Sequence, residues 1–142
     1  MTHTHVHELA DRLRDAWRRR DAAALANCHH PDAVIDSPLF ANARGHAAIE
    51  ASYATLFRAF PDLEVTVNAM LVDPPQVASY ETMRGTHSNE FLGYPGTNKR
   101  LEISLARLMT VEDGQITRQL VIYDFTGLLV QLGVLSAKPG KR

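Results

Sequence analysis

The sequence predicts an α+β fold in which a cone-shaped, curved antiparallel sheet packs against N-terminal helices and is followed by a short C-terminal helix. Apolar residues recur at helical spacing as far as Phe60, and beyond it they alternate with polar residues. The predicted strands follow one another without intervening helices, which favours hairpin connections over the crossovers of a parallel sheet. A sheet curved over helices encloses an apolar interior, so we expect a ligand pocket there.

Length and composition indicate one domain spanning residues 1–142, with residues 1–6 as a disordered arm and 136–142 as a flexible tail. The net charge of −1 argues against nucleic-acid binding. The sequence has no apolar run approaching the roughly 20 residues of a membrane span. Cys28 is the single cysteine, so an internal disulfide is excluded and a cytoplasmic location is expected.

Three helices are expected before Phe60. The first covers residues 7–20, where one face is apolar and the other charged, and its final arginines are interpreted as a solvated helix end. Asp21 is a plausible N-cap for a short helix over residues 22–28, which Pro31 and Asp32 should separate from a brief strand. The strongest helical pattern covers residues 45–60 and ends at Pro61.

Four strands and a last helix are expected after Pro61. Alternating apolar residues predict strands over residues 63–67, 77–84, 101–105 and 115–123. A Gly- and Pro-rich loop should occupy residues 93–99, and Asp113-Gly114 suits a hairpin turn. A short apolar helix should end at Gly133.

Arg107 and Gln119, on two of the predicted strands, are candidate substrate-binding residues. Arg107 continues the apolar face of its strand, where an arginine needs a carboxylate partner or a place at the mouth of the pocket. Gln119 and Tyr123 share one face of their strand, whereas Asp124 falls on the other. A bulge near Tyr123 would be needed to turn both Gln119 and Asp124 inward.

Asp124 and His87 are the candidate catalytic residues. A carboxyl group buried in an apolar pocket acquires a raised pKa and can act as a general acid and base. From the residues alone, Asp124 is better placed as the N-cap of the last helix. His87 could transfer a proton or bind a carbonyl group, and the alternative is a polar side chain beside a turn.

Aromatic residues at helical spacing supply further candidates for substrate binding, namely Trp17, Tyr53 and Phe57, although such residues often belong to an ordinary core. His29, His30 and Asp36 show no recognisable spacing for metal ligands. We therefore predict no metal.

Three stretches of the chain carry a resemblance to a known family. They are the helix end Phe60-Pro61-Asp62, residues 85–99 (GTHSNEFLGYPGTNK) and residues 124–133 (DFTGLLVQLG). With the order of the predicted elements, they resemble the SnoaL-like polyketide cyclases of the nuclear transport factor two-like superfamily. The resemblance extends from the first helix to Gly133.

The resemblance implies a cofactor-independent cyclase or isomerase acting on a small apolar, polyketide-like carbonyl compound by proton transfer. It implies that Asp124 is the acid and base, and that the protein forms a homodimer. Where family members carry a His-Trp pair, this chain has Gln119 and Leu120. The alternatives are a non-catalytic ligand-binding or dimerising protein of the same fold, and an enzyme similar to epoxide hydrolase or ketosteroid isomerase.

Overall fold

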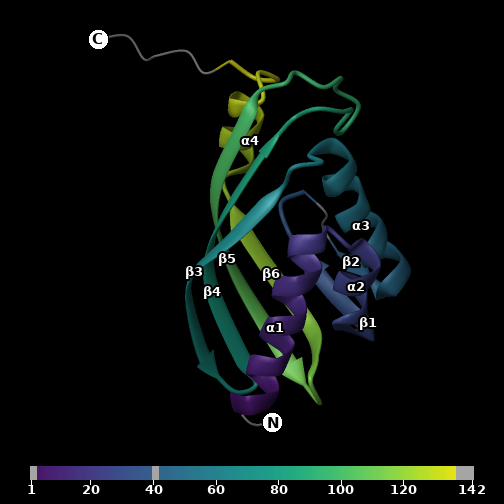
Figure 1. Ribbon diagram of the computed structural model, residues 1–142, viewed down its shortest axis with the longest axis vertical. Helices are drawn as coiled ribbons and strands as arrows, with labels where there is room; N and C mark the ends of the chain where they lie inside the picture. The colour runs from purple at the N-terminus through teal and green to yellow at the C-terminus, as the bar shows by residue number, and fades with distance from the viewer. Residues whose placement is uncertain (1–2, 40–41, 137–142) are drawn as a thin grey trace.

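The computed structural model describes residues 3–39 and 42–136. Within them, six strands form one curved sheet in the order β2-β1-β6-β5-β4-β3, and helices α1 to α3 lie on its concave side (Figure 1). The α+β architecture is as predicted. In chain order the elements are α1 (His3–Arg19), α2 (Ala22–Asn27), β1 (His29–Asp36), β2 (Ala43–Arg44), α3 (Gly45–Ala59), β3 (Glu64–Asp73), β4 (Gln76–Thr86), β5 (Arg100–Glu112), β6 (Gln115–Tyr123) and α4 (Phe125–Gln131).

The sheet is mixed rather than wholly antiparallel, because β1 pairs with β6 in parallel. The neighbouring pairs β3–β4, β4–β5 and β5–β6 follow one another along the chain and are antiparallel. Two-residue turns join β3 to β4 at Pro74-Pro75 and β5 to β6 at Asp113-Gly114, and such turns are visible in the sequence. The β1–β6 pair joins segments far apart in sequence, so no local turn signal fixes its direction.

β1 is also longer than predicted, since it begins at His29 and includes Pro31 and Asp32. Its pairing with β6 is irregular between His29 and Val34. A proline cannot donate to a regular ladder but is accommodated at such an irregularity. The two residues therefore interrupt the pairing without ending the strand.

The N-terminal helix begins earlier than predicted. Residues 3–6 belong to α1 instead of a disordered arm, and Val6 is buried against a cluster that includes Cys28, Val77 and Ile116. Burial of this apolar side chain favours helix over disorder. Residues 1–2 and 137–142 of the expected arm and tail lie outside the described residues. None of the described helices has the length and apolar character needed to cross a bilayer.

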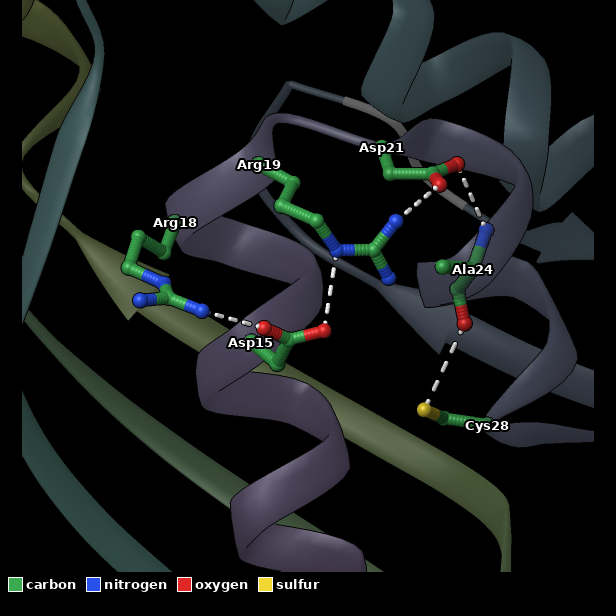
Figure 2. Close-up of polar contacts among 6 residues, drawn as sticks. All are labelled: Asp15, Arg18, Arg19, Asp21, Ala24 and Cys28. Carbon is green, nitrogen blue, oxygen red and sulfur yellow. Dashed lines mark hydrogen bonds and ion pairs between the residues drawn. The ribbon is translucent and has the colours of Figure 1, made fainter.

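The corner between α1 and α2 is held by ion pairs and a helix cap (Figure 2). Asp15 accepts hydrogen bonds from Arg18 at 2.6 Å and from Arg19 at 2.9 Å. Arg19 also contacts Asp21 at 2.9 Å, and Asp21 caps α2 through the backbone N–H of Ala24 at 3.0 Å. Arg18 and Arg19 thus form a solvated, paired helix end, whereas the half-buried Arg20 donates to the carbonyl oxygen of Leu63. The predicted N-cap is confirmed.

The concave face of the sheet carries the core. In β5 the odd-numbered side chains from Leu101 to Val111 are buried and the even-numbered ones are exposed, except that Thr110 is half-buried. Ile49 and Tyr53 of α3 pack toward this face. Apolar side chains also lie exposed on the opposite, convex face of the sheet: Tyr80, Leu108, Leu120 and Ile122.

Candidate functional site

Two cavities lie between the concave face and the helices in the described part of the chain. The large chamber, of about 730 Å³, lies between α1 and strands β3 to β5. The small chamber, of about 70 Å³, lies between α3, strands β4 to β6 and α4. Trp17, Tyr53 and Arg107 line both chambers and therefore form the boundary between them.

Arg107 is the charged group at this boundary, and it is paired with Glu81. Arg107 projects from β5 with 8% of its surface exposed, and Glu81 projects from the adjacent strand β4 with 4% exposed. The Nε of Arg107 donates to Oε2 of Glu81 at 2.9 Å, and Nη2 donates to Oε1 at 3.2 Å. Ser79 adds a 2.5 Å hydrogen bond from its hydroxyl to Oε2. The guanidinium of Arg107 therefore binds the Glu81 carboxylate in the bidentate geometry that arginine favours.

A second set of hydrogen bonds fixes the other side of the guanidinium. Nη1 of Arg107 donates to Oε1 of Gln119, whose Nε2 lies 3.0 Å from Nε2 of His29. The Nδ1 of His29 lies 2.8 Å from the carbonyl oxygen of Leu25 and must donate to it. Nε2 of a neutral His29 then accepts from Gln119, which fixes the orientation of the Gln119 amide.

Burial and charge set the protonation states of this network. Burial favours a neutral Glu81, but the adjacent Arg107 charge and the hydrogen bonds to the carboxylate outweigh it and lower the pKa of Glu81. Burial lowers the pKa of His29 to about 4 and raises the pKa of Tyr53. At neutral pH the site therefore contains one ion pair, a neutral imidazole and a neutral phenol.

The aromatic side chains at the boundary hold the guanidinium in place. The ring of Trp17 lies 5.7 Å from Cζ of Arg107, a cation–π distance, and packs edge-on against Tyr53. The nearby Arg107 charge and Gln119 side chain oppose the rise that burial causes in the pKa of Tyr53. Phe57 packs edge-on against Trp17 at 5.6 Å but lines neither chamber. Of the three predicted aromatic residues, Trp17 and Tyr53 thus reach the cavity and Phe57 supports Trp17 from behind.

Asp124 does not project into either chamber defined by the described residues. Its exposed side chain is the N-cap of α4 and accepts a hydrogen bond from the N–H of Gly127 at 2.8 Å. The pairing of β5 with β6 is regular from Leu105↔Tyr123 to Thr110↔Arg118, so the bulge that would turn Asp124 inward is absent from this stretch. The expectation that this carboxylate lies in the pocket is therefore corrected.

His87 is buried but lies away from the chambers, just beyond the end of β4. Its Nδ1 is 3.0 Å from the hydroxyl of Thr97, and its ring packs against Phe60 and Phe91. Its Nε2 has no hydrogen-bond partner among the described residues. The fold thus separates His87 and Asp124 from the network that contains Arg107 and Gln119.

Sequence reasoning missed Glu81 and His29. Glu81 lies in the predicted strand over residues 77–84, on the same face as Val77 and Met83. That parity was available as a signal that a carboxylate faces the core beside Arg107. His29 gave no comparable signal, because it pairs with Gln119 only after β1 and β6 have come together.

The family model for SnoaL-like polyketide cyclases matches residues 7–132 of this sequence. The chain belongs to this family. The match runs from within α1 to just beyond α4 and therefore includes every strand of the sheet. A comparison with curated proteins found no match.

Solved structures share the family fold over almost the whole chain. AclR from Streptomyces galilaeus, described provisionally as a hydroxylase, is 26% identical with a TM-score of 0.82, covering 95% of this chain and 100% of AclR. IdmH from Streptomyces antibioticus, described provisionally as a polyketide cyclase, is 29% identical with a TM-score of 0.75, covering 90% of this chain and 98% of IdmH. TsrD from Streptomyces laurentii, at 24% identity and a TM-score of 0.83 over 95% of this chain and 99% of TsrD, shows the same fold.

Proposed function

We propose that this family member is a cofactor-independent enzyme that forms an enolate from a small apolar carbonyl compound, as the first step of a cyclisation or isomerisation. The observation that carries the proposal is the buried Arg107–Glu81 pair at the boundary of an apolar cavity. Arg107 and Tyr53 would bind the carbonyl oxygen, and Glu81 would remove a proton from the adjacent carbon. The carboxylate becomes a stronger base as Arg107 turns from it to the oxygen that gains charge, because the guanidinium is what lowers the pKa of Glu81.

Arg107 has the hydrogen-bonding capacity that the proposal requires. A guanidinium has five N–H groups, and hydrogen bonds to Glu81 and Gln119 use one on each of its three nitrogens. One N–H on each terminal nitrogen is left for Tyr53 or a ligand. Fixed donors in a site of low dielectric stabilise a developing oxyanion strongly, because they need no reorganisation during the reaction.

Proton transfer to Glu81 would conserve charge in the buried site. The C–H bond of the substrate breaks, an O–H bond forms on the carboxylate, and the negative charge moves to the enolate oxygen. Arg107 then pairs with the enolate in place of Glu81. A buried cation thus keeps an anionic partner throughout, which avoids the large cost of an unpaired interior charge.

The fate of the enolate would decide the overall reaction. Attack of its carbon on a second carbonyl group of the same molecule closes a ring, and the proton held by Glu81 passes to the new alkoxide. Where a C=C bond is conjugated with the enolate, return of that proton to the far carbon gives an isomer with the double bond moved. Both outcomes regenerate the ionised Glu81 and consume no cofactor.

Hydrogen–deuterium exchange tests enolate formation without requiring the natural substrate. The probe is 1-(2-naphthyl)propan-2-one in D₂O, and proton NMR follows its CH₂ and CH₃ groups separately. We expect the protein to accelerate exchange at the CH₂ group, and Glu81→Gln to reduce that acceleration by about 10²–10⁴-fold, the usual contribution of a general base. Glu81→Asp, which keeps the charge opposite Arg107, is the control for loss of folding.

Two other outcomes would favour competing functions. If the probe quenches the fluorescence of Trp17 but does not exchange, the protein is a ligand-binding member of the family. If Asp124→Asn abolishes exchange while Glu81→Gln does not, the base is Asp124, as the family resemblance implied.

We also propose that the protein acts as a homodimer in the cytoplasm. The exposed apolar residues on the convex face lie on adjacent strands, where Leu108 is paired with Leu120 and Ala106 with Ile122. Contiguous exposed apolar surface commonly marks a protein interface. The single cysteine, Cys28, fits a reducing compartment.

A further inference from the structure

We infer that His29 is a positioning residue for Arg107, and that it acts through the side-chain amide of Gln119. The inference rests on the proposed binding of the carbonyl oxygen by Arg107. His29 is fully buried and lines neither chamber of the described structure, so it is not placed to touch a ligand there. Gln119 does line the large chamber, and His29 holds its amide in the orientation that supports the guanidinium.

Three hydrogen bonds connect the end of α2 to Arg107 in one direction. The carbonyl oxygen of Leu25 accepts from Nδ1 of His29 at 2.8 Å, and Nε2 of His29 accepts from Nε2 of Gln119 at 3.0 Å. Oε1 of Gln119 accepts in turn from Nη1 of Arg107. A carbonyl group only accepts and a guanidinium only donates, so the two ends of this series fix its direction. The neutral tautomer of His29 with its proton on Nδ1 is the form that satisfies both ends.

The contact between His29 and Gln119 is made at a break in the regular sheet. In the parallel β1–β6 pair, Gln119 lies opposite Ile35 and not opposite His29. The pairing is irregular between His29 and Val34. Irregularities of this kind re-aim side chains and are common beside active sites. The start of β1 is therefore arranged in a way that a regular ladder would not require.

The support that Gln119 gives is uncharged, which suits the change of charge in the proposed reaction. When Glu81 takes up a proton, Nε and Nη2 of Arg107 lose their anionic partner. Gln119 still accepts from Nη1, so the guanidinium keeps one fixed contact while it pairs with the enolate. A carboxylate at this position would instead compete with the enolate for the positive charge of Arg107.

The support depends on the acceptor that His29 provides. Gln119 is 1% exposed, so its Nε2 group has little access to water. Without His29 this buried N–H group is left unpaired, which is costly. Gln119 relieves the cost by turning toward another acceptor, and Arg107 then loses its fixed contact.

Two substitutions of His29 test the inference because each keeps a different one of its hydrogen bonds. The amide of glutamine places an acceptor near the position of Nε2, whereas the shorter amide of asparagine places a donor near that of Nδ1. His29→Gln should therefore still support Gln119, and His29→Asn should not. Both variants remove the imidazole, so a merely structural role predicts similar effects for the two.

The first readout is exchange of 1-(2-naphthyl)propan-2-one in D₂O, measured over a range of ketone concentrations. We expect His29→Asn to lower kcat by about 10–100-fold, since a misplacement of about 1 Å can cost about 10²-fold. KM should change little, because the lost support matters once charge has moved to the enolate. His29→Gln should retain most of the wild-type kcat.

The second readout needs no reaction. Trp17 is the only tryptophan in the chain, and its ring lies 5.7 Å from Cζ of Arg107, so its emission reports on the position of the guanidinium. His29→Asn should shift the emission maximum, and His29→Gln should leave it unchanged. If neither variant folds, ¹⁵N NMR of the wild-type imidazole decides: an Nδ1–H tautomer supports the inference, and a proton on Nε2 overturns it.

The inference is overturned if the two folded variants lose exchange equally, or if His29→Asn matches the wild type in kcat and in Trp17 emission. Failure of the proposed function has a different signature. If the wild type does not accelerate exchange, the enzyme proposal fails, and the emission of the two variants still tests the role of His29. If exchange depends on Glu81 but not on His29→Asn, the proposed function stands and the positioning role is wrong.

Discussion

Arg107 and Glu81 depend on each other because folding buries both charged side chains almost completely. Their side chains are 9% and 5% exposed, and the bidentate contact is supplemented by Ser79 and Gln119. Removing one partner of a buried pair leaves an uncompensated charge, whereas replacing both by apolar side chains often preserves stability. The pair is therefore better explained by function than by folding.

Replacing Arg107 alone should be far more damaging than replacing the pair. We expect Arg107→Met to lower the free energy of unfolding by about 3–5 kcal/mol, because Glu81 is left buried and unpaired. The double variant Arg107→Met/Glu81→Leu should recover most of that loss. Urea unfolding of the three proteins measures the effect, and a double variant no more stable than the single one would contradict it.

His29 should make the stability of the protein depend on pH. Burial, assisted by the nearby Arg107 and His46, lowers its pKa from 6.5 to about 4. Between these two pH values His29 is protonated in the unfolded chain and neutral in the folded protein. The contribution of His29 is complete above pH 6.5 and is lost as the pH falls toward about 4. The loss corresponds to about 3 kcal/mol.

Chemical unfolding between pH 7 and pH 4 measures this contribution. His29→Gln keeps an amide beside Gln119 but removes the titrating group. We expect the stability of the wild type to fall by about 3 kcal/mol more than that of the variant over this interval. Parallel pH profiles for the two proteins would show that His29 is not held neutral.

At the scale of single residues, alternation along a strand was the most informative pattern. It predicted that Arg107 faces the core and needs a partner, and it placed Gln119 and Asp124 on opposite faces. The structure keeps that alternation, so Gln119 is buried and Asp124 is exposed. Family resemblance pointed to Asp124 as a pocket residue, whereas the strand geometry puts Glu81 there.

At the scale of elements, α4 illustrates how one side chain can start a helix. The carboxylate of Asp124 accepts the N–H of Gly127, and the carbonyl oxygen of Asp124 accepts the N–H of Leu128. Leu128 and Leu132 are then buried against the end of the sheet. The cap therefore positions part of the wall of the small chamber.

Substitutions at Asp124 separate capping from catalysis. Asp124→Ala should destabilise the protein by about 1 kcal/mol, the usual value of a cap, whereas Asp124→Asn should cost little because asparagine caps equally well. Thermal unfolding measures both. If exchange of the naphthyl ketone is unaffected by Asp124→Asn, Asp124 has a capping role alone; a large loss of exchange with unchanged stability would identify it as the base.

The boundaries of the elements followed the local signals closely where those signals were strong. β6 was predicted as observed, and α3 within one residue, because the hairpin turn and Pro61 mark their ends. β3 and β5 extend well beyond the predicted alternating runs. Pairing with a neighbouring strand supplies hydrogen bonds to residues whose side chains carry no strand pattern of their own.

At the scale of the whole molecule, the convex face of the sheet is where self-association should occur. We expect Ile122→Glu to convert a dimer into a monomer, because Ile122 is 59% exposed on this apolar surface and a charge there opposes its burial. Sedimentation velocity measures the assembly state. Ala47→Glu, on an exposed turn of α3, is the control, and an unchanged dimer in Ile122→Glu would place the interface elsewhere.

The sequence by itself determined the α+β class and most of the helices and strands, because these depend on spacing along the chain. It left open which face of the strand over residues 115–123 points inward. The same spacing also placed Arg107 on the apolar face of its strand, and Gln119 became a candidate through the family resemblance. Only the tertiary structure decided that Glu81 and His29 join them and that Asp124 and His87 lie apart. Partners in a buried network come from segments that meet through β1–β6 and β4–β5 pairing, and the position of a side chain in a cavity depends on distances that no local pattern contains.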